Sequence, residues 1–201
     1  MKRKIYEQLL RWKNESAPET ALLIEGARRV GKSWIVEEFA KCEYRSFVLI
    51  DFNKVSKAVI DVFKNDLEDL DVFFRKLSEY YGVRLYEGET LFVFDEVQEF
   101  PRARAAIKYL VEDGRYHFIE TGSLMSIAEN VTGIVIPSEE DSIKMYPLDF
   151  EEFLWATGRA DMVETIKSHR RDLAPFGAVH RKMIEAFREY LVVGGMPQAV
   201  S

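Results

Sequence analysis

Apolar and polar positions follow two patterns that alternate along the chain. The first pattern is a short run of almost continuously apolar residues. In the second, which fills the segments between these runs, apolar residues recur every three or four positions, as in helices that cover a sheet. Because the runs themselves are almost continuously apolar and are separated by helices, we expect an α/β fold with a parallel sheet covered on both faces. The predicted buried strands are Thr20–Glu25, Ser46–Phe52, Thr90–Val97 and Tyr116–Glu120.

The helical pattern fills most of the remaining chain and dominates its last quarter. A further short strand is expected near Ile143–Tyr146. Because only helices are predicted after that strand, we expect an α/β domain over residues 1–148 and a helical subdomain over 149–201. The predicted helices are 4–13, Ser33–Cys42, two within Lys54–Gly82, one from Pro101 to Gly114, 124–130, Asp149–Gly158, Asp161–Leu173 and Arg181–Val193.

Composition is that of an ordinary soluble globular protein, with 47% hydrophobic and 31% charged residues. The net charge of −6 argues against a generally basic surface that coats DNA, although it leaves room for a local patch. A single cysteine, Cys42, excludes an intrachain disulfide. The N-terminus is charged, and no apolar run is long enough to cross a bilayer. We therefore expect a cytoplasmic protein with no membrane association.

One motif carries specific chemistry. Residues 26–33 read Gly26-Ala27-Arg28-Arg29-Val30-Gly31-Lys32-Ser33, a full match to the phosphate-loop pattern G-x-x-x-x-G-K-[ST]. The motif follows an apolar strand and opens a helix, as a loop that cradles phosphates with its backbone N–H groups must. Lys32 would bind the β- and γ-phosphates from an exposed position at the mouth of the loop, and Ser33 would offer its hydroxyl to Mg²⁺. The sequence therefore predicts binding of ATP with Mg²⁺.

The third strand ends in two adjacent carboxylates, Asp95 and Glu96. Beside a phosphate loop, Asp95 would hold Mg²⁺ and Glu96 would act as general base on the attacking water. The alternative is a solvated strand end without chemistry. After the next strand, Thr121-Gly122-Ser123 is either a polar sensor of the γ-phosphate, through Thr121 or Ser123, or a plain turn.

With two consecutive carboxylates at this place, the chain resembles the ATPase branch in which an additional strand lies between the loop strand and the acidic strand. In that arrangement Ser46–Phe52 would be an outer strand. More specifically, the chain resembles a prokaryotic AAA-type ATP-binding family with a helical C-terminal domain of unknown function. The segments that carry the resemblance are IEGARRVGKS (24–33), FVFDEVQEFP (92–101), ETGS (120–123), MYPLDFEEFL (145–154) and GGMPQAV (194–200).

The resemblance implies a three-layer P-loop NTPase fold and an arginine that completes the site, often from a neighbouring subunit. In that family the GGMPQAV-type segment leads into further helices, so we expect this chain to be a fragment. The sequence cannot choose the arginine among Arg102, Arg104, Arg159, Arg170 and Arg171.

Two other features have competing interpretations. Trp12 lies close enough to the loop strand to line an adenine pocket, but packing in the core explains it equally well. The acidic run Glu139-Glu140-Asp141 resembles a metal cluster, but we expect it to be exposed in a loop.

The sequence as a whole favours an ATPase whose hydrolysis of ATP to ADP drives a conformational change in the helical part. Three alternatives stay open: a slow nucleotide-dependent switch that recruits a protein, a DNA-associated ATPase that reads DNA through a further C-terminal domain, and a small-molecule kinase. A homo-oligomer is possible, and the client, protein or DNA, is not specified.

Overall fold

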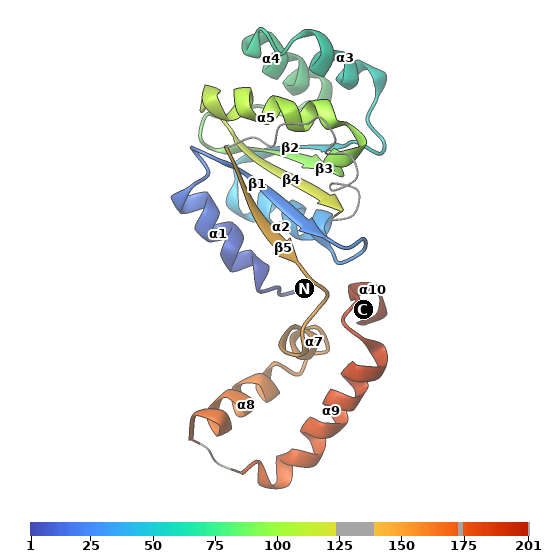
Figure 1. Ribbon diagram of the computed structural model, residues 1–201. Helices are drawn as coiled ribbons and strands as arrows, with labels where there is room; N and C mark the ends of the chain where they lie inside the picture. Colours follow the sequence, from blue (N-terminus) through green and yellow to red (C-terminus); the bar gives the residue numbers. More distant parts are fainter. Residues whose placement is uncertain (124–138, 173–174, 201) are drawn as a thin grey trace.

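The computed structural model describes residues 1–123, 139–172 and 175–200, and these contain a five-stranded parallel sheet of order β2-β3-β4-β1-β5 (Figure 1). Every neighbouring pair of strands is parallel, which confirms the predicted α/β class. The strands are β1 Ala21–Gly26, β2 Ser46–Asp51, β3 Thr90–Asp95, β4 His117–Ser123 and β5 Glu140–Met145.

Helices cover both faces of this sheet and continue into an arm below it (Figure 1). Helices α1 and α2 pack on one face, and α3, α4 and α5 pack on the other. The helices are α1 Ile5–Glu15, α2 Lys32–Glu43, α3 Lys57–Asn65, α4 Leu70–Tyr81, α5 Pro101–Asp113, α7 Phe150–Ala156, α8 Ala160–Asp172, α9 His180–Val193 and α10 Pro197–Val200, with the 3₁₀ turns η1 Val97–Glu99 and η2 Gly177–Val179.

The strand order places the additional strand where the sequence resemblance implies it. Strand β4 lies between the loop strand β1 and the acidic strand β3, and β2 is at the edge. Gly26 pairs with Ser123, and Phe94 pairs with Glu120, so β1, β3 and β4 end at the same edge of the sheet. In open parallel sheets, ligands bind outside this carboxyl edge.

Large side chains fill the two layers between sheet and helices. On the α3–α5 face, Phe63 and Phe94 are fully buried and meet edge to face, with ring centroids 5.5 Å apart. On the other face, Leu9 and Trp12 of α1 pack with Phe39 of α2. Trp12 is therefore a core residue, and the interpretation of it as part of an adenine pocket is wrong.

Strand β5 differs from the sequence-based expectation. The predicted strand near Ile143–Tyr146 begins earlier, at Glu140, and pairs along its whole length with β1. The Glu140 side chain is only 3% exposed and forms an ion pair with Arg104 of α5, Nη2 to Oε2 at 2.8 Å. The expectation of an exposed acidic loop is wrong for Glu140, because this arginine allows the carboxylate to be buried. The helix expected at 124–130 lies outside the described residues.

A second carboxylate, Glu120 of β4, is completely buried beside this ion pair. Burial, and then the neighbouring Glu140 carboxylate, raise the pKa of Glu120 well above its ordinary value. The folded protein therefore keeps a proton that the unfolded chain releases near pH 4 to 5, so this group makes the protein less stable as pH rises towards its folded-state pKa.

We expect Glu120→Gln to remove this loss, so that the variant is more stable than the wild type at pH 8 and differs less from it at pH 5. Thermal denaturation at several pH values measures this. Glu112→Gln, which changes an exposed carboxylate of α5, is the matched control and should leave the profile unchanged. Parallel pH profiles for Glu120→Gln and the wild type would contradict the assignment.

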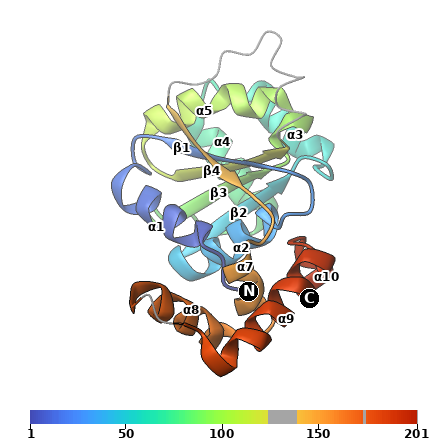
Figure 2. The same cartoon turned by 60° about the horizontal axis from the view of Figure 1, so that its bottom comes forward.

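The helical part begins directly after β5 and forms an open arm (Figures 1 and 2). Its own small core contains Leu154, Val163 and Ala186 from α7, α8 and α9. The arm returns to the sheet domain at its end, because Gly195 O accepts a hydrogen bond of 2.7 Å from Leu148 N. Helix α10 and the N-terminus both lie near the carboxyl edge of β1 (Figure 1).

Candidate functional site

The phosphate-loop motif connects β1 to α2 at the carboxyl edge of the sheet. Two of its residues have left-handed backbone conformations, Arg29 with φ of 67° and Gly31 with φ of 96°. Gly26 has no room for a side chain, because a Cβ there would lie 2.3 Å from Met145 O of β5. The loop therefore needs glycine at 26 for close packing and at 31 for its backbone angle.

Lys32 lies inside the loop. Its Nζ donates hydrogen bonds of 3.0 Å to Gly26 O and Ala27 O, and the residue is only 4% exposed. Burial lowers the pKa of Lys32, an effect that the nearby Glu96 and Asp95 carboxylates oppose. The expectation of an exposed lysine is wrong, because the loop curls around the ammonium group and supplies carbonyl acceptors.

Three elements bring oxygen atoms together at the end of β3. Ser33 Oγ of α2 donates a 2.8 Å hydrogen bond to Asp95 Oδ1, and Thr121 Oγ1 of β4 donates to the same oxygen. Asp95 is 7% exposed, and burial raises its pKa against the lowering effect of these two hydrogen bonds. A hydroxyl and a carboxylate are the oxygen ligands that Mg²⁺ prefers, so Ser33 and Asp95 fit this metal.

Glu96 follows Asp95 in a left-handed conformation, with φ of 55°. Its N–H donates a 3.2 Å hydrogen bond to Thr121 Oγ1, and its carboxylate accepts one from Gln98 Nε2. Thr121 therefore contacts both carboxylate residues, whereas Ser123 lies two residues further along β4, opposite Gly26. The arrangement of Asp95, Glu96 and Thr121 is not that of a merely solvated strand end.

Three residues near this edge were not predicted from the sequence. Gln98 contacts Glu96, Trp34 lines a pocket beside the loop, and Arg3 donates a hydrogen bond to the loop carbonyl of Val30. Gln98 had a detectable signal, since it lies three residues after a candidate metal ligand. Arg3 had none, because a basic residue near a chain end is usually solvated.

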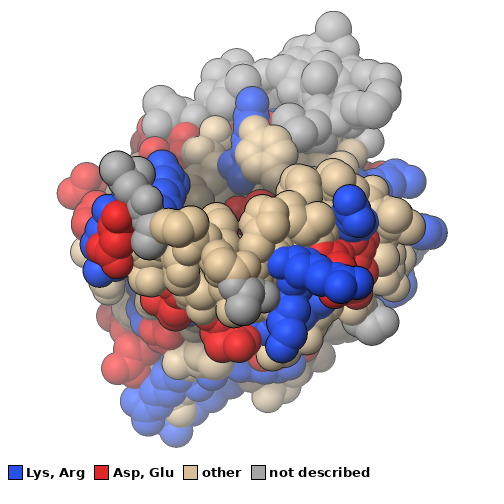
Figure 3. Space-filling view, turned by 90° about the horizontal axis from the view of Figure 1, so that it is seen from below, with Lys and Arg blue, Asp and Glu red and all other residues tan. Residues whose placement is uncertain are grey.

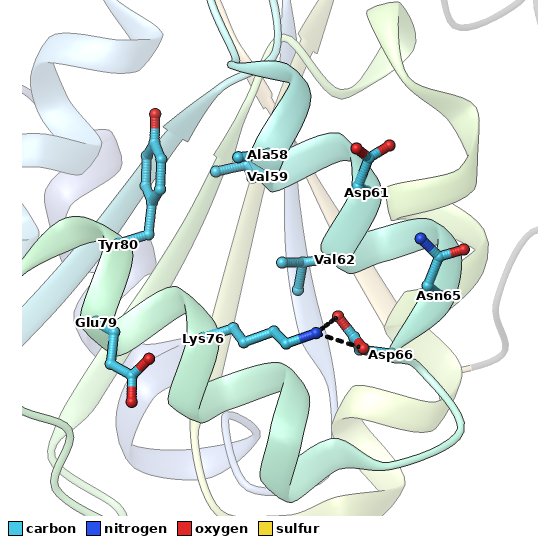
Figure 4. A pocket seen from close by; sticks show the side chains of 9 residues that line it. All are labelled: Ala58, Val59, Asp61, Val62, Asn65, Asp66, Lys76, Glu79 and Tyr80. Carbon is cyan, nitrogen blue, oxygen red and sulfur yellow. Dashed lines mark hydrogen bonds and ion pairs between the residues drawn. The ribbon is translucent and has the colours of Figure 1, made fainter.

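A pocket of about 360 Å³ adjoins the phosphate loop. It is lined by Met1, Arg3, Gly31, Trp34, Pro197 and Gln198. It therefore combines the N-terminus, the loop and α10, and its lining includes Trp34, a residue that is 42% exposed. A second cavity, of about 480 Å³, lies between α3 and α4 and is lined only by residues of that pair and the turn that joins them, so it is separate from the loop (Figure 4).

Three of the candidate finger arginines already have partners in the chain. Arg102 donates to the backbone carbonyls of Phe63 and Lys64, and Arg159 pairs with Glu189. Arg104 is buried against Glu140, as described above. Arg170 and Arg171 are exposed on α8.

The chain is similar in sequence to a known protein family. The sequence profile of a family described as "AAA domain" matches residues 18–154. The chain belongs to this AAA domain family. The matched residues include the whole sheet, the phosphate loop and Asp95 with its partners. The family match therefore supports the interpretation of this chain as a nucleotide-binding ATPase domain.

A curated relative of this AAA domain matches it at low sequence identity. An uncharacterised protein of Methanocaldococcus jannaschii is 24% identical over 194 residues, 92% of this chain and 40% of that protein. The chain thus spans less than half the length of this curated relative.

Among solved structures, Cdc6p of Pyrobaculum aerophilum has a TM-score of 0.47 at 15% identity, with coverage of 81% of this chain and 51% of that one. The Aeropyrum pernix ORC1 protein, solved in complex with DNA, has a TM-score of 0.48 at 12% identity, with coverage of 81% and 50%. At these TM-scores, neither similarity indicates a function for this AAA domain.

Within residues 1–123, 139–172 and 175–200, no helix is long and apolar enough to cross a membrane.

Proposed function

We propose that this AAA domain binds ATP with Mg²⁺ and hydrolyses it to ADP and phosphate. The observation that carries the proposal is the convergence of the Ser33 and Thr121 hydroxyls on one carboxylate oxygen of Asp95, next to a phosphate loop that encloses Lys32. These groups come from three different elements, α2, β3 and β4, and a shared binding task accounts for their meeting at the ligand-binding edge of the sheet.

Each residue then has a defined task. The backbone of residues 26–33 binds the phosphates together with the N-terminus of α2, and the Lys32 ammonium exchanges its two carbonyl acceptors for phosphate oxygens. Ser33 and Asp95 would hold Mg²⁺, which would supply positive charge to offset that of the phosphates. Glu96 orients and deprotonates the attacking water, and Thr121, or Ser123, detects the γ-phosphate.

The pocket beside the loop is the proposed place for the nucleotide base. An aromatic wall from Trp34 and an apolar contact from Pro197 suit a flat heterocycle. Pro197 belongs to the 194–200 segment, so bound nucleotide would touch both the sheet domain and the helical part. Hydrolysis would then be coupled to movement of the helical part.

The substitution Asp95→Asn tests the metal part of this proposal. We expect Mg·ATP to bind at least about tenfold more weakly, because the metal loses its charged anchor, while metal-free ATP binds with little change. Isothermal titration with and without Mg²⁺ measures both. Asp61→Asn is the control, because Asp61 lines the cavity between α3 and α4, which is separate from the phosphate loop.

An equal response of the two aspartate variants would contradict a metal role for Asp95. Turnover of ATP without an acceptor substrate would exclude the kinase alternative. Turnover stimulated by DNA would support the DNA-associated alternative, although on the face seen in Figure 3 basic side chains lie among acidic ones. The cytoplasmic location, a homo-oligomer and the client stay predictions.

A further inference from the structure

The segment ahead of α1 contains a buried arginine that contacts three separate parts of the molecule. Arg3 Nη1 donates to Val30 O in the phosphate loop at 2.9 Å, and Nη2 donates to Tyr146 O after β5 at 2.7 Å. Nε donates to Glu152 Oε1 of α7 at 3.1 Å. Arg3 is 5% exposed. One guanidinium group therefore joins the phosphate loop to the first helix of the helical part.

On the loop side, the hydrogen bond fixes a peptide group that matters for phosphate binding. The carbonyl of Val30 and the N–H of Gly31 belong to the same planar unit and point in opposite directions. Holding the oxygen therefore sets the direction of the N–H. Gly31, which follows this peptide, is left-handed, and so is Arg29 before Val30, so the hydrogen bond from Arg3 supports an unusual stretch of backbone.

On the helical side, Glu152 is fixed by the first turn of its own helix. Its Oε2 accepts a hydrogen bond from Asp149 N, and Asp149 Oδ1 accepts one from Glu152 N, which together form a capping box. Its Oε1 also accepts a hydrogen bond of 2.8 Å from Lys4 N. The carboxylate that holds Arg3 therefore moves with α7.

The two buried charges depend on each other. Removing one partner of a buried ion pair leaves the other uncompensated, so loss of the Glu152 charge destabilises the buried position of Arg3 even though two carbonyls still accept its hydrogen bonds. Lysine cannot replace the arginine, because the three acceptors need the fixed fork of a guanidinium group.

We propose that Arg3 is a positioning residue that orients the Val30–Gly31 peptide for phosphate binding and, through Glu152, makes this orientation depend on the position of α7. The proposal rests on the proposed nucleotide binding. In this arrangement, displacement of α7 withdraws Glu152 from Arg3, and the loop loses the hydrogen bond that Arg3 donates to it. Because coupling between two sites is reciprocal, bound nucleotide in turn favours the position of α7 in which Glu152 contacts Arg3.

The test is a double-mutant cycle on Mg·ATP affinity with Arg3→Lys, Glu152→Gln and the double variant. We expect Arg3→Lys to weaken binding on the order of tenfold, as for loss of one charged hydrogen bond. Glu152→Gln should weaken it less, and the double variant should be no worse than Arg3→Lys, because both changes act through one linkage. Amide hydrogen exchange in residues 150–156 should slow when the wild type binds nucleotide and should lose this response in Arg3→Lys.

Lys4→Met is the matched control at the same junction. Lys4 Nζ contacts Asp149 and Glu151, which also links the N-terminus to α7, but Lys4 has no hydrogen bond to the loop among the described contacts. We expect its nucleotide affinity to stay within about twofold of the wild type. A purely structural role for Arg3 would lower melting temperatures without changing affinity measured on folded protein.

Wild-type affinity in Arg3→Lys, additive effects in the cycle, or an unchanged exchange response in α7 would each overturn the proposal. If Arg3→Lys fails to fold, Glu152→Gln decides alone: wild-type affinity in that variant overturns the linkage, and weakened affinity supports it. Absence of ATP binding by the wild type would instead overturn the proposed function, and the Arg3 inference with it.

Discussion

Replacing Lys32 by methionine should abolish tight ATP binding, with a loss of affinity of at least about a hundredfold. The ammonium group is the only charged donor that the phosphate-loop pattern supplies to the β- and γ-phosphates. Methionine has a side chain of similar length, so it fills the buried space that alanine would leave empty. Isothermal titration with ATP and Mg²⁺ measures the loss.

The fold should tolerate this change. Burial lowers the pKa of Lys32, which means that the folded protein bears a cost for keeping the ammonium charged there. Removing the charge relieves that cost, although Gly26 O and Ala27 O lose their donor. Lys41→Met, which changes an exposed lysine near the end of the same helix, is the control and should bind ATP normally. Unchanged affinity in Lys32→Met would refute the phosphate-loop assignment.

Glu96→Gln should bind Mg·ATP with nearly wild-type affinity and cleave it about 10²–10⁴ times more slowly. Glutamine preserves the shape of the side chain and an oxygen that can accept the hydrogen bond from Gln98 Nε2. The backbone position also persists, because it depends on the N–H bond to Thr121 Oγ1. The substitution removes only the general base, so the affinity for Mg·ATP should stay nearly the same while the rate of cleavage falls. Single-turnover cleavage and titration on the same sample measure the two quantities.

Glu99→Gln provides the matched comparison, because Glu99 is an exposed glutamate three residues further along, in η1. It should cleave ATP at the wild-type rate. If Glu96→Gln also cleaves at that rate, Glu96 is not the general base, and the domain would be a nucleotide-binding module that uses another group or none.

The sequence by itself determined the sheet and the loop, because both depend on local patterns. Continuous apolar runs such as Thr90–Val97 indicate strands buried on both faces, and the loop needs glycine at 26 for close packing and at 31 for its backbone angle. The position of Asp95 and Glu96 at the end of an apolar strand was also visible in the sequence, and the phosphate loop upstream gave the pair its predicted role. Strand order came from the resemblance and is confirmed by β4 between β1 and β3.

The tertiary structure decided how groups distant in sequence share the buried space. Lys32 is enclosed because the loop carbonyls accept hydrogen bonds from its ammonium group. Glu140 is buried because α5 brings Arg104 to it. Arg3 and Glu152 are 149 positions apart in the chain, and no periodicity or spacing connects them. Burial of a charge depends on a partner, and only the folded chain brings that partner within hydrogen-bonding distance.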